Sequence, residues 1–169
     1  MKPIFTKSFL AVLFLGLISI TACNNDDDGD NDCTGHLHAS WKVNGVLEES
    51  YQGWHITTTS LLGLTFKSCD DENKSIIISY IPSPPAVGTY QLKYGPGSPI
   101  TQVGTYNLGD ANIDYHTTDS IDGTLVITEV NTTDKTLSGT FSFDAVKDDG
   151  SGEIISITEG QIFNTVYED

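Results

Sequence analysis

Beyond residue 35, hydrophobic positions recur at every second residue rather than at every third or fourth. In the segment Leu137–Ala145, every odd-numbered residue is apolar or glycine, and every even-numbered residue is serine, threonine or aspartate. A strand turns successive side chains to opposite faces of a sheet, so this alternation is typical of a strand with one buried face. The segment therefore predicts a half-buried β-strand.

Segments rich in Thr, Ile, Val, Tyr and Phe recur through the rest of the chain, between glycine and Asp/Asn positions that favour turns. The further segments that predict strands are His38–Val43, Gly53–Thr59, Leu62–Lys67, Ser75–Ile81, Gly88–Tyr94, Gly104–Leu108, Gly123–Val130, Glu153–Glu159 and Gln161–Tyr167. No segment shows a helical pattern. The predicted fold class is all-β, an antiparallel β-sandwich or flattened barrel of about 8–10 short strands.

Two local patterns refine this picture. Ser75–Ile81 carries three consecutive isoleucines, so we expect a central strand that is covered on both faces. The polar segment 147–152 predicts a turn that pairs Leu137–Ala145 with Glu153–Glu159 as a hairpin. Gly160 is expected to end that strand before a last one begins.

The N-terminus has the pattern of an export signal. Lys2 and Lys7 precede an apolar run, residues 9–20, that is too short to span a bilayer as a helix. The segment 20–23, Ile-Thr-Ala-Cys, resembles a bacterial lipobox, which implies lipidation of Cys23 and cleavage before it. The alternative is an ordinary signal peptide followed by a chance cysteine. The predicted organisation is a lipoprotein signal peptide (1–22), a lipidated cysteine with an acidic tether (23–35) and a β-sandwich domain (36–169).

Residues 24–32 are asparagine, aspartate and glycine only. Such a run repels itself and stays extended, so it suits a spacer. An acidic run directly after the lipidated cysteine resembles the surface-export signal of Bacteroidota lipoproteins, which implies the outer membrane and its outer surface. A calcium loop is the alternative, but Gly35 stands where the closing acidic ligand is required.

The charge balance excludes some partners. The chain has 23 acidic residues against 8 lysines, no arginine, and a formal net charge of −15. Nucleic acid is not expected as a partner, because binding phosphates requires clusters of Lys and Arg. Motifs for serine hydrolases, nucleotide loops and dinucleotide binding are absent, so no enzyme activity and no cofactor are predicted. The acidic pairs, including Glu48 with Glu49 and Asp148 with Asp149, are interpreted as solvated charge.

Cysteine and histidine offer two candidate sites. Cys33 and Cys69 are predicted to form a disulfide in an oxidising compartment, with two free thiols as the alternative. His36 and His38, with His55 or His116, have the residue types of a zinc site. Surface histidines are the preferred interpretation, and no metal is predicted.

Two further candidates concern carbohydrate. Trp41 and Trp54 flank the first predicted turn, and aromatic rings can stack on sugars, so they are a candidate ligand surface. Partly buried core is the preferred interpretation of both tryptophans. The sequence Asp119-Ser-Ile121 resembles the O-glycosylation site of exported Bacteroidota proteins, which makes Ser120 a candidate for modification.

Three segments carry a wider resemblance. Residues 40–45, 123–145 and 152–163 resemble a group of small Bacteroidota lipoproteins that are filed as a domain of unknown function. The resemblance implies an all-β domain behind a lipobox and transfers no catalytic residue.

Together these patterns predict a lipid-anchored protein of the cell envelope. We expect a non-catalytic binding or accessory module at the outer-membrane surface, whose partner is a glycan, a peptide or another envelope protein. The alternatives are a structural surface protein without a ligand and a glycan-active hydrolase.

Overall fold

The computed structural model describes residues 34–58, 60–94, 102–109 and 114–168, and within them the chain forms eleven β-strands and no helix. The strands are β1 (Ala39–Val43), β2 (Val46–Ser50), β3 (Gly53–Thr57), β4 (Leu61–Lys67), β5 (Ser75–Pro82), β6 (Gly88–Leu92), β7 (Val103–Asn107), β8 (Asp114–His116), β9 (Gly123–Asn131), β10 (Thr136–Lys147) and β11 (Ile154–Val166). The all-β prediction is confirmed. In this part of the chain no helix is long and apolar enough to cross a membrane.

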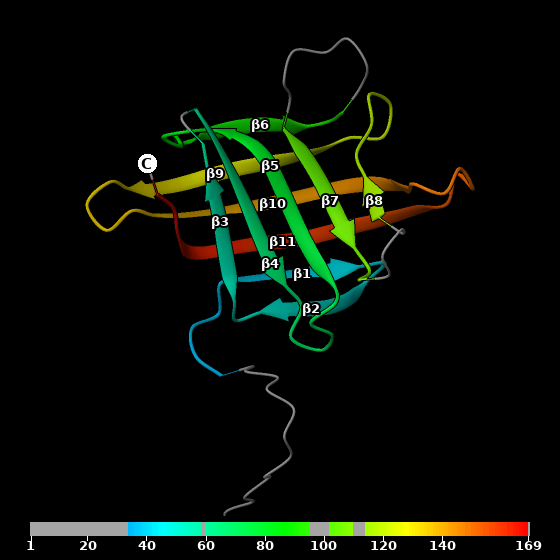
Figure 1. Ribbon diagram of the computed structural model, residues 1–169, viewed down its shortest axis with the longest axis horizontal. Helices are drawn as coiled ribbons and strands as arrows, with labels where there is room; N and C mark the ends of the chain where they lie inside the picture. The colour runs from blue at the N-terminus through cyan, green and yellow to red at the C-terminus, as the bar shows by residue number, and fades with distance from the viewer. Residues whose placement is uncertain (1–33, 59, 95–101, 110–113, 169) are drawn as a thin grey trace, which may run out of the picture.

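Nine strands form a nearly closed antiparallel barrel, in the order β2-β1-β11-β10-β8-β7-β5-β4-β3. The remaining two extend it, because β9 pairs with β10 and β6 pairs with β9. Figure 1 shows two layers whose strands cross at a steep angle. We call β3, β4, β5 and β7 the front sheet and β6, β9, β10, β11, β1 and β2 the back sheet. The short strand β8 joins the layers through its pairing with β7 and β10.

Alternating side chains fill the space between the layers. In β10, Leu137, Phe141, Phe143 and Ala145 are buried, while the residues between them face outward. The front sheet contributes inward residues with the same two-residue period, such as Leu62, Leu64 and Phe66 on β4. Full burial of each large apolar side chain contributes about 1.5–3 kcal/mol. The predicted hairpin of β10 with the following strand is confirmed.

Two local predictions are wrong. Gly160 does not end a strand: β11 runs through it, and the pairing of β10 with β11 shifts register between Phe141 and Phe143. An added residue in one strand is a β-bulge, which lets the strand continue past the glycine. Strand β5 is central in the barrel, but it is covered on one face only, because Ile77 points outward and is half-buried.

Candidate ligand-binding face

The outer side of β3, β4, β5, β7 and β8 carries a straight row of residues, one from each strand. The pairing places Trp54 opposite Thr65, Thr65 opposite Ile77, Ile77 opposite Thr105, and Thr105 opposite His116. Directly paired residues of antiparallel strands point to the same side of a sheet. Their neighbours along each strand are the inward core residues, so this row faces solvent. We call this outer side the aromatic face.

Tyr80 joins this face through a bulge in β5. Leu62 pairs with Ile81, whereas Leu64 pairs with Ile78. Between these two pairs, β5 therefore has two residues where β4 has one. Ile78 and Ile81 both stay in the core, and Tyr80 between them is 43% exposed. Its φ of 64° lies in the left-handed region, which is unusual for a bulky residue. The bulge thus turns an aromatic ring outward that simple alternation would bury.

Two shallow grooves lie side by side on the aromatic face. One, of about 230 Å³, is lined mainly by apolar and small residues of the front sheet: Ile56, Thr58, Leu61, Leu62, Gly63, Thr65, Ile77, Ser79 and Tyr80. The other, of about 440 Å³, is lined by Ser79, Tyr80, Tyr94, Val103, Thr105, His116 and Asp148. The grooves share Ser79 and Tyr80, so they adjoin each other in the middle of the sheet, and we call the two together the depression.

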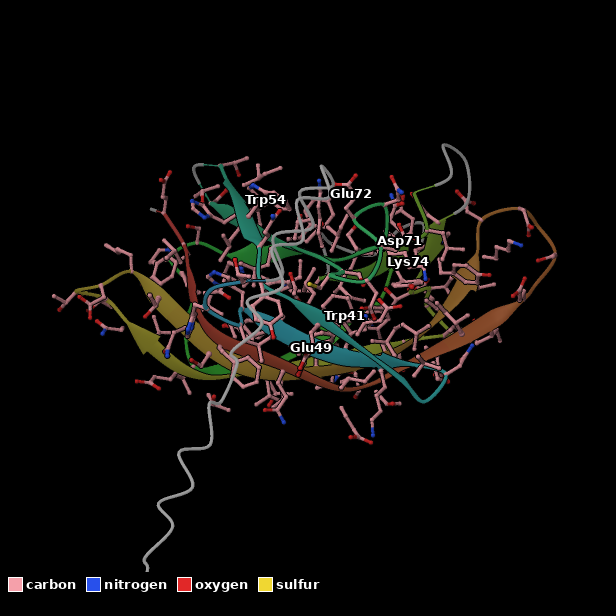
Figure 2. All side chains as sticks on the ribbon, turned by 90° about the horizontal axis from the view of Figure 1, so that it is seen from below. Trp41, Glu49, Trp54, Asp71, Glu72 and Lys74 are labelled. Carbon is pink, nitrogen blue, oxygen red and sulfur yellow. The ribbon has the colours of Figure 1, made fainter. Side chains whose placement is uncertain are left out.

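Exposed aromatic rings accompany this depression: Tyr80 and Tyr94 line it, and Trp54 lies beside it, opposite the lining residue Thr65. Trp54 is 41% exposed and lies on the outer side of the front sheet in Figure 2, with the Lys67 Nζ atom 4.7 Å from its ring centroid. Tyr94 is 57% exposed and packs edge-on against His116, at 6.3 Å between ring centroids. Each ring is held by a polar neighbour while much of its surface stays open to solvent.

The lining combines three kinds of chemistry. Apolar surface comes from Tyr80 and Ile77, hydroxyl groups come from serine and threonine, and formal negative charge comes from Asp148 alone among the lining residues. Sites for small ligands are mostly apolar with a few polar groups that fix orientation. This face can therefore hold a ligand that has both apolar and hydroxyl-bearing surface.

Trp41 is not part of any ligand surface. It is fully buried between the layers, and its Nε1 atom donates a hydrogen bond of 3.0 Å to Glu48 Oε2. Tyr106, from the opposite layer, donates its hydroxyl to Glu48 Oε1 at 2.9 Å. Of the two tryptophans proposed for a shared surface, Trp41 is core, because its indole fills the barrel interior, and only Trp54 is exposed.

Glu48 corrects a second prediction. It is 7% exposed and lies on β2 inside the barrel, so its side chain is not solvated charge. Its carboxyl group satisfies two buried donors that belong to different layers. Burial, followed by the hydrogen bond to Glu48, raises the pKa of Tyr106 far above its usual range. This network ties the two layers together and is not accessible to a ligand.

The histidines do not gather into a metal site. His36 and His38 lie edge-on at 5.3 Å between ring centroids, whereas His55 is 3.6 Å from the Glu168 carboxylate and His116 packs against Tyr94. Within the described ranges, no group of three or more His, Cys, Asp or Glu side chains could hold a metal ion. The three-histidine zinc alternative is therefore not formed. Burial, with a smaller effect of His36, lowers the pKa of His38.

The remaining candidates lie partly outside the described residues. Cys23 and Cys33 fall there, as do the signal peptide and the acidic run. Cys69 is disulfide-bonded, and its pairing with Cys33 stays a prediction. Ser120 is exposed, with its Oγ atom 3.5 Å from that of Thr118, and its glycosylation also stays a prediction.

Three residues of the aromatic face escaped the sequence interpretation. Tyr80 follows two inward isoleucines at the same period, so alternation places it in the core. Tyr94 begins a Gly/Pro-rich segment that predicts only a loop. His116 lies on a strand of three residues, too short for a periodic signal. For Tyr80, the prolines directly after the isoleucine run were the one available signal of an irregular strand end.

The fold and this face define an all-β domain with an exposed aromatic sheet surface. A family model described as a domain of unknown function, DUF6252, matches residues 63–166, and the chain belongs to this family. The match contains Tyr80, Tyr94, Thr105 and His116 but begins after Trp54. No curated protein and no solved structure matches the chain.

Proposed function

We propose that this protein is a non-catalytic module that binds a saccharide on its aromatic face. One observation carries the proposal: the exposed rings of Tyr80 and Tyr94 line two adjoining grooves on a single sheet face, and the exposed ring of Trp54 lies beside them, directly opposite the lining residue Thr65. Large exposed aromatic side chains on a soluble surface mark interaction sites.

A saccharide fits this chemistry better than the other candidate partners. Sugar rings have an apolar face of C–H groups that packs on aromatic rings, and a rim of hydroxyls that hydrogen-bonds to side chains such as Ser79, Thr105 and His116. An apolar peptide would favour a deeper and less polar groove. A second envelope protein would favour a larger apolar area than these shallow grooves offer.

We further propose that the module is anchored in the outer membrane through Cys23 and faces outward. The lipobox pattern and the acidic run after it support this. Replacing Cys23 by serine should leave the protein unlipidated and released from membranes. Retention of that variant in the membrane fraction would contradict the anchor. Replacing Asp26–Asp28 by alanine should reduce protease accessibility on intact cells, and unchanged accessibility would count against surface exposure.

The binding proposal is tested on an array of glycans and peptides, with the protein purified in detergent. We expect saccharides to bind, and the double variant Trp54→Ala with Tyr94→Ala to lose that binding by roughly tenfold or more. The matched control replaces Thr140 and Gln161, which are exposed on the back sheet, by alanine and should bind normally. Binding of peptides alone, or of nothing on the array, would overturn the proposal.

A further inference from the structure

We infer that the ligand is an extended, uncharged oligosaccharide that lies across the strands of the aromatic face, from Trp54 to Tyr94. The inference rests on the proposed function and specifies the length, direction and charge of the bound chain. It is carried by the row of paired residues, the two adjoining grooves and the distribution of charge.

The length follows from the strand spacing. The row from Trp54 to His116 crosses five strands, each residue directly opposite the next. Neighbouring strands lie about 4.8 Å apart, so four spacings give roughly 19 Å. A single sugar residue would occupy only part of this distance, whereas several linked residues would cover it.

The direction follows from the grooves. The smaller groove reaches toward β3 and the larger toward β8, and they meet at Ser79 and Tyr80 in the middle of the sheet. Gly63 leaves space between Ile56 and Tyr80, because the nearest atom to a Cβ at this position would be the Ile56 carbonyl oxygen at 3.8 Å. Gly63 therefore places no side chain in the smaller groove beside the junction.

The rings are placed for such a chain. Trp54 stands at one end, Tyr80 at the junction and Tyr94 at the other end, each more than two-fifths exposed. Between them the outward hydroxyls of Thr65, Ser79 and Thr105 supply donors and acceptors at successive strands. Stacking positions thus alternate with hydroxyl groups along the depression, as a linear saccharide with repeating units requires.

The charge distribution favours an uncharged saccharide over a charged one. Asp148 is the acidic residue in the lining, Lys67 is placed over the Trp54 ring, and the whole chain carries a formal net charge of −15. A sulfated or carboxylated glycan would be repelled by the protein as a whole and would find no cluster of cations among the described residues that line the grooves. An uncharged polyhydroxyl chain meets neither obstacle.

The test measures affinity by calorimetry for neutral glucose oligomers of several linkages, from disaccharide to hexasaccharide. The purified full chain is used in detergent. We expect affinity to rise at least about tenfold from the disaccharide to the hexasaccharide, and the sulfated hexasaccharide to bind at least about tenfold more weakly than the neutral one. Trp54→Ala should remove most of the gain in affinity with oligomer length.

A second variant separates folding from binding. Gly63→Val adds a β-branched side chain to the smaller groove, beside the junction, in an open position, so the fold should persist while hexasaccharide affinity falls. Thr140→Val, on the back sheet, is the matched control and should bind normally. Equal affinity for short and long oligomers would overturn the inference but leave saccharide binding intact. Equal binding of the sulfated chain would overturn its uncharged character, and absence of binding by every glycan on the array would overturn both proposals.

Discussion

The aromatic face and the outer face of the back sheet meet the solvent in different ways. On the outer side of β10, β11 and β1, which we call the polar face, neighbouring side chains bond to one another. The pairs are Lys42 with Glu159 at 2.8 Å, Ser156 with Asp144 at 2.6 Å, and Ser138 with Asn164 at 3.2 Å. On the aromatic face the largest side chains instead leave ring surface open. On the polar face these polar side chains satisfy one another, whereas the aromatic face presents exposed aromatic ring surface.

On both faces, residues with a left-handed backbone conformation lie at register shifts, but their side chains are used differently. Glu159 and Asn164 have φ values of 53° and 44° and lie at register shifts of β11, as Tyr80 does in β5. The outward side chain of Glu159 meets Lys42, and that of Asn164 meets Ser138. Tyr80 instead presents its ring to the grooves. A left-handed conformation costs a residue with a Cβ about 1–2 kcal/mol, so the protein holds an aromatic ring outward at an energetic cost.

The largest predicted effect comes from a substitution in the buried hydrogen-bond network that lies beneath both faces. Glu48→Ala should destabilise the protein by about 2–5 kcal/mol, because it leaves the Trp41 Nε1 and Tyr106 hydroxyl groups buried without an acceptor. Both faces should be lost together in one transition. Urea unfolding, followed by tryptophan fluorescence, measures this change.

The control for this prediction is Glu48→Gln. The amide oxygen can still accept from Trp41, and the Tyr106 hydroxyl can turn to accept from the amide nitrogen, so the cost should be about 1 kcal/mol. Stability of Glu48→Ala equal to that of the wild type would show that the network does not tie the layers. Loss of one face without global unfolding would contradict the shared core.

The next effect compares one glycine from each layer. At Gly160 an added Cβ would lie 2.5 Å from a ring carbon of Phe141 and 2.5 Å from the backbone carbonyl oxygen of Phe141. At Gly63 the nearest atom to an added Cβ is 3.8 Å away. Gly160→Ala should cost about 1–3 kcal/mol through overpacking. Gly63→Ala should leave the free energy of unfolding within about 0.5 kcal/mol of the wild type. Equal effects of the two substitutions on thermal unfolding would contradict this difference in packing between the layers.

Sequence patterning predicted the core and the hairpins but not the departures from regular alternation. The odd-numbered residues of Leu137–Ala145 face the interior, as predicted, because a buried sheet face fixes the register. Strand β2 was missed because its two adjacent glutamates suggest solvent exposure, although Glu48 has buried donors to satisfy. Tyr80 was missed because a bulge depends on pairing between strands, which no local pattern contains.

The candidate site was predicted less well than the fold. Trp54 was named with Trp41 as a candidate ligand surface, although partly buried core was the preferred interpretation of both; Trp54 is exposed, whereas Trp41 is buried in the core. Residues that are close along the chain did not share a face, because the side chain from one strand can point inward while the side chain from a nearby strand points outward. The residues that accompany Trp54 come from four other strands, β4, β5, β7 and β8, and from the segments that carry Tyr94 and Asp148, and only the sheet order brings them together.

A third effect concerns Tyr80 itself. Tyr80→Gly removes strain of about 1–2 kcal/mol but adds backbone freedom worth roughly 0.5–1 kcal/mol, so stability should change by less than about 1 kcal/mol. Saccharide affinity should fall roughly tenfold, because the ring at the groove junction is lost. Asn164→Gly makes the same backbone change on the polar face and should leave binding intact. Equal affinity of wild type and Tyr80→Gly, measured by calorimetry, would remove Tyr80 from the site.

The smallest effect lies in the turn between β10 and β11, where the two faces meet. Asp148 lines the larger groove, and the adjacent Asp149 accepts a hydrogen bond of 2.8 Å from the Ser151 backbone N–H. Hydrogen bonding from the Ser151 hydroxyl and N–H, with a smaller effect of Lys147, lowers the pKa of Asp149 from its ordinary 3.8 to about 2. Because the pKa of Asp149 is lower in the folded state, these hydrogen bonds stabilise the turn at pH values above the pKa of the unfolded state. Their contribution is lost as the pH falls through the pKa of the folded state.

The turn that positions Asp148 should therefore keep its geometry from neutral pH down to about pH 4, and change only as pH approaches 2. Ser151→Ala should raise the pKa of Asp149 toward its ordinary value and move the loss of turn structure to higher pH, whereas Ser142→Ala on the polar face should not. Carboxyl carbon NMR shifts of Asp149, recorded against pH in the three proteins, measure this directly. If the Asp149 carboxyl titrates near pH 3.8 in the wild type, Ser151 does not hold the turn. The turn then does not fix the position of Asp148 at the end of the larger groove.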